Sequence, residues 1–71
     1  MTSSMKFNIE IKGNLDSLML WSLIEKYHVN LTQVGDYTWV YGETSITAIA
    51  KIISCCALFG DLKIELSGGG E

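Results

Sequence analysis

Hydrophobic and polar residues alternate along two stretches of the chain, residues 5–12 and residues 61–66. The apolar positions are Phe7, Ile9 and Ile11 in the first stretch and Leu62, Ile64 and Leu66 in the second. A period of two predicts a strand with one buried and one exposed face. The chain is therefore expected to begin and end with half-buried strands.

Two further stretches, residues 15–28 and 46–59, have helical spacing. In the first, Leu20, Leu23, Ile24 and Tyr27 fall within one arc and predict a core-facing stripe. Asn14 is expected to cap this helix, and His28 lies where its charge would favour the C-terminal end. Thr44 or Ser45 is expected to cap the second helix, and Gly60 to end it in a left-handed conformation.

Between the helices, the segments 29–34 and 37–43 flank Gly35 and Asp36. A two-residue loop with glycine first predicts a type II′ hairpin turn, which fixes the register of the two strands. The expected pairs are Val34–Tyr37, Gln33–Thr38, Thr32–Trp39, Leu31–Val40 and Asn30–Tyr41. One face then carries Val29, Leu31 and Val40, and the other carries the aromatic side chains.

The order of these elements is β-α-β-β-α-β, in which two β-α-β halves are joined by a hairpin. This order predicts a ferredoxin-like α+β domain with a four-stranded antiparallel sheet of strand order 4-1-3-2. Right-handed crossovers place both helices on one sheet face. We expect a single domain over residues 5–66, with flexible ends at 1–4 and 67–71.

Composition adds a second expectation. The chain has 71 residues, 48% of them hydrophobic, and its mean hydropathy is +0.26. That is more apolar material than a lone small domain needs for its core, and the second helix is apolar on nearly every side. Some of this surface is therefore expected to meet another molecule.

The charge of the chain argues against nucleic acid and against anionic membranes. The formal net charge is −3, and all five basic residues are lysines. Arginine is the usual side chain for gripping phosphate, and a nucleic-acid binder normally has a basic patch. The sequence shows no apolar run long enough for a membrane span and no signal-peptide pattern, so we expect a cytoplasmic protein.

Side chains suited to chemistry are few and scattered. His28 is the only histidine, and the carboxylates lie on separate elements. Cys55 and Cys56 are neighbours in a helical pattern, which favours buried free thiols over a disulfide or a metal site. We expect no enzymatic activity, no cofactor and no bound metal.

Two surfaces are candidates for binding. The first is the sheet face with Tyr37, Trp39 and Tyr41, together with Thr32, because aromatic side chains are enriched in interface cores. The second is the outer side of the first helix, with Leu18 and Trp21. In the simplest alternative, the aromatic residues only favour strands and shield the sheet. The leading hypothesis is a protein-binding module that docks a partner or forms a homodimer.

Size and acidity suit a small adaptor or inhibitor, of the kind that a virus or mobile element encodes. Single-stranded RNA binding is a further alternative, because RNA-recognition domains share this topology and stack bases on the sheet. Here the first strand shows Lys6, Asn8, Glu10 and Lys12 outward, without an aromatic residue, and arginine is missing. These features argue against RNA.

Two segments resemble a known family, the ACT domains. Residues 13–15, Gly-Asn-Leu, open the first helix, and residues 28–34, His-Val-Asn-Leu-Thr-Gln-Val, follow it. ACT domains are ferredoxin-like regulatory modules that pair and bind amino acids at the loop before the first helix. The resemblance implies a ligand site lined by Gly13, Asn14, Leu15 and Asp16, with Asn30 nearby. A sensor of amino acids is therefore the first alternative to a protein-binding module.

Overall fold

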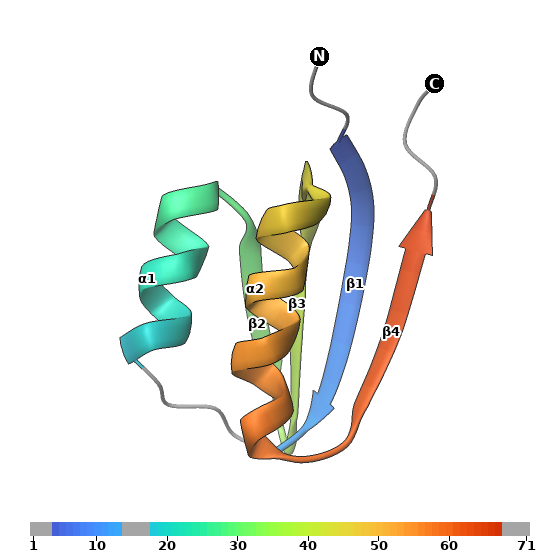
Figure 1. Ribbon diagram of the computed structural model, residues 1–71. Helices are drawn as coiled ribbons and strands as arrows, with labels where there is room; N and C mark the ends of the chain where they lie inside the picture. The colour runs from blue at the N-terminus through green and yellow to red at the C-terminus, as the bar shows by residue number, and fades with distance from the viewer. Residues whose placement is uncertain (1–3, 14–17, 68–71) are drawn as a thin grey trace.

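The computed structural model describes residues 4–13 and 18–67 (Figure 1). Its elements follow the expected β-α-β-β-α-β order. They are β1 (Ser4–Lys12), α1 (Leu18–Tyr27), β2 (Asn30–Val34), β3 (Tyr37–Ser45), α2 (Ile46–Cys56), the short 3₁₀ helix η1 (Ala57–Phe59) and β4 (Leu62–Ser67).

The four strands form one antiparallel sheet in the order β2-β3-β1-β4, which is the predicted ferredoxin-like order read from the other edge. All five expected pairs of the β2–β3 hairpin are confirmed, from Asn30 opposite Tyr41 to Val34 opposite Tyr37. Gly35 has a φ of 60°, and Asp36 is not among the residues with positive φ. A type II′ turn requires this combination, since only its first central residue has positive φ.

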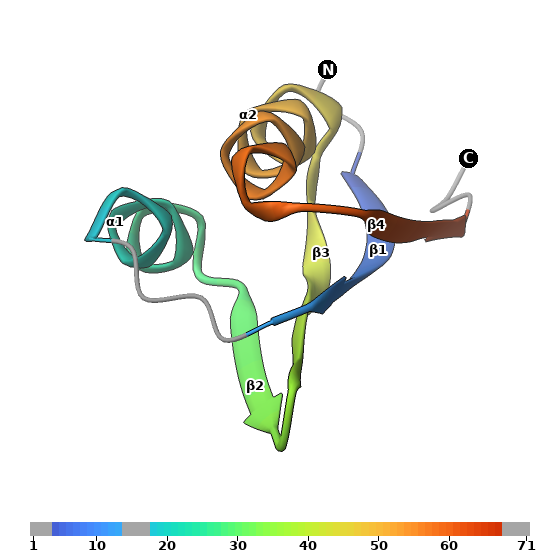
Figure 2. The same cartoon turned by 90° about the horizontal axis from the view of Figure 1, so that it is seen from below.

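Both helices lie on one face of the sheet (Figures 1 and 2). α2 packs against β1, β3 and α1. The core between the layers is apolar and includes the fully buried Ile9, Ile11, Val40, Leu20 and Ile52. Alternation along β1 and β3 places every second side chain in this core, as the sequence pattern predicts. In the described part of the chain, no helix is long and apolar enough to cross a membrane.

Several boundaries differ from the expectations. Ser4 and Ser67, which we assigned to the ends, belong to β1 and β4, while residues 1–3 and 68–71 lie outside the described residues. α2 ends at Cys56 and tightens into η1. Gly60 does not have the αL geometry that we expected: its φ of 141° is positive, a region that favours glycine, but its ψ is −154°, and the chain continues from it into β4. The Ser45 cap is confirmed, because its side chain accepts a hydrogen bond from the Ala48 N–H.

The end of α1 is closed by backbone geometry. His28 has a φ of 56°, in the left-handed region that ends many helices. Val29 N–H then donates to the Ile24 carbonyl at 3.2 Å, a bond typical of the Schellman motif. The role of His28 is thus to turn the chain from α1 into β2, which the sequence did not show. The expected Asn14 cap at the other end of α1 lies outside the described residues.

One polar side chain, Thr38, is fully buried in the described part of the chain. Its hydroxyl donates to the Gly13 carbonyl at 2.9 Å and accepts a 3.4 Å bond from the Gln33 amide. Gly13 N–H in turn donates to the Asp36 carbonyl. These bonds tie the tip of the hairpin to the end of β1.

Candidate protein-binding face

The aromatic residues of β3 lie on the sheet face opposite the helices. Thr38 and Val40 are buried beneath the helices, so the alternate residues Tyr37, Trp39 and Tyr41 point the other way. The side chains of Tyr37 and Tyr41 are 39% and 40% exposed, and Trp39 is half-buried. β3 is an inner strand, so this aromatic row runs through the middle of the open face.

The Trp39 ring is held from two sides. Its centroid lies 5.9 Å from that of Tyr37, with an angle of 26° between the ring planes. Its Nε1–H donates to Oε1 of Glu10 on β1 at 3.2 Å. A stacked ring with its polar edge satisfied keeps one orientation. The flat face that it offers to a partner is therefore already ordered.

Tyr41 is held from the opposite strand. Its hydroxyl and the Thr32 hydroxyl are 3.1 Å apart and share a hydrogen bond, in which either oxygen could donate. Asn30, beside Thr32 on this face, donates through its amide to the Tyr41 carbonyl at 3.4 Å. β2 thus supports Tyr41 as β1 supports Trp39. The structure brings together four of the predicted binding residues: Tyr37, Trp39, Tyr41 and Thr32.

Between these side chains lies a wide, open depression. It has a volume of about 550 Å³ and is lined by Asn8, Thr32, Trp39 and Tyr41. Polar atoms from Asn8 and Thr32 border two aromatic rings. Such a combination of apolar floor and polar rim is typical of the centre of a protein interface.

The charged residues around the aromatic row are balanced. Alternation and register place six of them on the open face: Lys6, Lys12, Lys63, Glu10, Glu43 and Glu65. Three are basic and three are acidic, and Glu10 lies beside Trp39 in the centre of the face. A polyanion such as RNA needs an excess of positive charge, which this face does not have.

The second candidate surface lies on α1 and is separate. Leu18 is 86% exposed and Trp21 is 43% exposed. Met19 and Leu23 of the same helix face α2. At 100° per residue, Trp21 is about 160° to 200° away from both of them. Leu18 and Trp21 thus lie on the side of α1 that faces away from α2, and not on the open sheet face.

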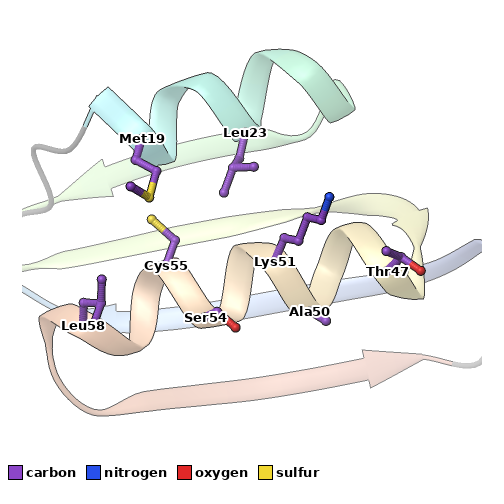
Figure 3. Close-up of a pocket in the computed structure, with 8 residues that line it drawn as sticks. All are labelled: Met19, Leu23, Thr47, Ala50, Lys51, Ser54, Cys55 and Leu58. Atoms are coloured by element: carbon purple, nitrogen blue, oxygen red, sulfur yellow. The ribbon is translucent and has the colours of Figure 1, made fainter.

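A feature that the sequence reasoning missed is a groove between the two helices (Figure 3). Its volume is about 560 Å³, and Met19 and Leu23 point into it from α1 while Cys55 and Lys51 point into it from α2. Leu58 lies at its end and is well exposed. The sequence did contain a sign of this groove. Residues 18–20 are three consecutive apolar residues, whereas a helix that buries a single stripe has apolar residues only three or four positions apart.

The two cysteines are free and buried. Burial, and to a smaller extent the neighbouring Cys55, raises the pKa of the Cys56 thiol to about 11. A thiol with a raised pKa is a poor nucleophile and a poor metal ligand at neutral pH. Within residues 4–13 and 18–67, no group of three histidine, cysteine or acidic side chains is placed to hold a metal ion.

The loop implied by the ACT resemblance is described only at Gly13. Asn14, Leu15 and Asp16 lie outside the described residues. Gly13 follows Lys12, which pairs with Tyr37, whereas Asn30 pairs with Tyr41. Four residues of β3 separate these positions, or roughly 13 Å along the strand. Asn30 and Gly13 therefore lie beside different parts of β3.

Comparison of the chain with models of protein families, with curated proteins and with solved structures found no significant match.

Proposed function

We propose that this chain is a non-enzymatic protein-interaction module that docks a protein partner on its open sheet face. The observation that carries the proposal is the row of Tyr37, Trp39 and Tyr41, which no described helix covers. Hydrogen bonds to Glu10 and Thr32 support the row from both neighbouring strands. Because the rings are already ordered, a partner binds them with little loss of side-chain entropy.

The balanced charges of this face favour a protein over a nucleic acid. Small size and mild acidity suit an adaptor or an inhibitor. Free buried thiols suit a reducing compartment such as the cytoplasm.

The experiment compares two tryptophan variants. The tagged wild-type chain, Trp39→Ala and Trp21→Ala are used to recover interacting proteins from the source cells, and each recovered protein is then purified and titrated. We expect a partner whose affinity falls at least about tenfold with Trp39→Ala and stays within about twofold with Trp21→Ala. Tyr41→Ala, at an exposed position, repeats the test without removing a contact of the half-buried indole, whereas Tyr37→Ala also removes the ring that stacks on it.

Other outcomes point elsewhere. Loss of binding with Trp21→Ala alone would move the docking surface to α1 and contradict the proposal. Binding of single-stranded RNA with a steep salt dependence would replace the protein partner by RNA. Thermal melts of each variant separate loss of a contact from loss of the fold.

Amino-acid sensing is the second candidate, and one observation favours it. Gly13 directly follows β1 at the place where ACT domains open their ligand loop, and the two share the ferredoxin-like topology. A sensor predicts that amino acids raise the melting temperature of the wild-type chain. The rise should vanish with Asp16→Ala and persist with Asp36→Ala.

A further inference from the structure

The outer edge of β4 is uncovered. β4 pairs with β1 on one side, and no described strand pairs with its other side. α2 lies over β3 and β1, and β4 extends beyond it (Figure 2). As a result Ile64 and Leu66, on the helix-side face of β4, are 40% and 54% exposed. β4 therefore offers unpaired backbone groups beside an apolar row, the combination that invites another strand.

The opposite edge of the sheet differs. β2 has only five residues, and Asn30, Thr32 and Gln33 make most of it polar. Short length and polar side chains are devices that protect an edge from pairing. Of the two edges, β4 is the one suited to association.

The charges of β4 are self-complementary. Lys63 and Glu65 lie on the open face, on either side of Ile64. If two copies pair antiparallel about a two-fold axis at Ile64, Lys63 of each chain lies opposite Glu65 of the other. Leu62 then lies opposite Leu66 of the second copy on the helix-side face. Opposite charges and apolar pairs at such positions stabilise a sheet.

Neighbouring registers lack this match. In an antiparallel pair, directly opposite side chains lie on the same face of the sheet. The helices of both copies therefore share one face only if opposite residues are both even-numbered or both odd-numbered in β4. Moving the axis by one residue places Lys63 opposite Lys63, or Glu65 opposite Glu65, and like charges directly opposite are destabilising. Among the registers centred on residues 63, 64 and 65, the charge pattern therefore favours the one centred on Ile64.

We propose that the chain forms a homodimer by antiparallel pairing of β4 with β4 of a second copy. The two sheets then join into one of eight strands, and Ile64 and Leu66 are covered on both sides of the axis. This interface is isologous, as most homodimer interfaces are. It leaves the aromatic row of each copy free, so it does not depend on the proposed docking of a partner there.

The test is a charge exchange followed by sedimentation equilibrium. We expect a wild-type dimer, and dimers of Lys63→Glu and of Glu65→Lys that are each about tenfold weaker or more, because each variant places like charges opposite one another. An equimolar mixture of the two variants should dimerise almost as tightly as the wild type, because each carboxylate then faces a lysine. Lys51→Glu, the same charge change on α2, should leave the dimer intact.

The mixture also separates contacts between copies from contacts within one chain. Lys63 lies opposite Glu10 of its own chain, and Lys63→Glu disturbs that pair as well. Mixing cannot repair a defect within one chain, so recovery in the mixture supports the interface. A wild-type chain that stays monomeric up to about 1 mM overturns the proposal. A dimer that the charge variants do not weaken, or that only Trp39→Ala dissociates, overturns it too.

Discussion

Trp39 and Glu10 lie directly opposite each other on β3 and β1, and the indole Nε1–H donates to the Glu10 carboxylate at 3.2 Å. The bond joins the centre of the aromatic row to the neighbouring inner strand. It also gives Glu10 a structural role, since the carboxylate satisfies the polar edge of a half-buried ring.

Removing the acceptor should loosen the indole. We expect Glu10→Ala to lower the free energy of unfolding by about 1 kcal/mol, whereas Glu10→Gln, which keeps an acceptor oxygen, should lower it by about half as much. Urea denaturation measures the difference, and the indole N–H resonance of Trp39 reports the bond itself. Equal effects of the two variants on both readouts would show that the bond does not order the ring.

Thr38 should matter more than its small size indicates. Thr38→Val keeps the shape but leaves the Gly13 carbonyl without its 2.9 Å donor. We expect a loss of about 1–2 kcal/mol in the free energy of unfolding. Thr38→Ser keeps the hydroxyl and loses only a methyl group, so in urea denaturation it should be the milder change. The reverse order would mean that packing, and not the hydrogen bond, determines the residue at this position.

Gly42, within β3, is expected to be hard to replace. Its φ is 151°, and a Cβ added there would lie 3.3 Å from the Cβ and Cγ1 atoms of Val29. Gly42→Ala should therefore lower the free energy of unfolding by about 1–3 kcal/mol, through backbone strain and crowding. Gly35→Ala is the matched control, because its φ of 60° also strains a side chain but nothing lies within 4 Å of the added Cβ, so the difference between the two variants reports crowding against Val29. Thermal melts that rank the two variants the other way would contradict this account.

Stability should fall as the pH rises from about 9 to about 11. In this range the Cys56 thiol ionises in the unfolded chain, where its pKa is near 9, but stays protonated in the folded chain, where the pKa is about 11. The folded state then holds more protons, so the free energy of unfolding decreases with pH, by about 2 kcal/mol in total. Below pH 9 this contribution is constant.

Lysines and tyrosines also titrate in this range, so the wild type alone does not identify the group. Cys56→Ala removes the thiol, and its own loss of packing does not depend on pH. The difference in unfolding free energy between wild type and Cys56→Ala should shrink as the pH rises through this range. A constant difference would show that the thiol is not the group responsible.

The sheet could be predicted from the sequence because local patterns, alternation and the hairpin turn, mark its strands. Alternation in residues 5–12 gave the buried face of β1, and the Gly35-Asp36 turn gave the register of β2 and β3. That register placed Trp39 on the open face, and the structure confirms it. The hydrogen bond to Glu10 required the pairing of β1 with β3, for which no local turn supplies a register.

Which apolar side chains are left exposed could not be predicted in the same way, because this depends on where the helices lie over the sheet. Alternation correctly put Ile64 and Leu66 on the helix side, but only the position of α2 decides whether that side is covered. The groove at Met19 likewise depends on the spacing of two helices, which the sequence does not encode locally. The conformation of His28 was missed because a left-handed residue after a helix is usually glycine or asparagine.

The passage from β3 to α2 has no connecting loop, because Ser45 is both the last residue of the strand and the cap of the helix. The direction and the rotation of α2 are therefore set by the pleat of the strand that precedes it. Inserting a single residue there would rotate the apolar stripe of α2 by about 100° and turn the fully buried Ile52 out of the core. Evolution and engineering are thus expected to leave this junction at its present length.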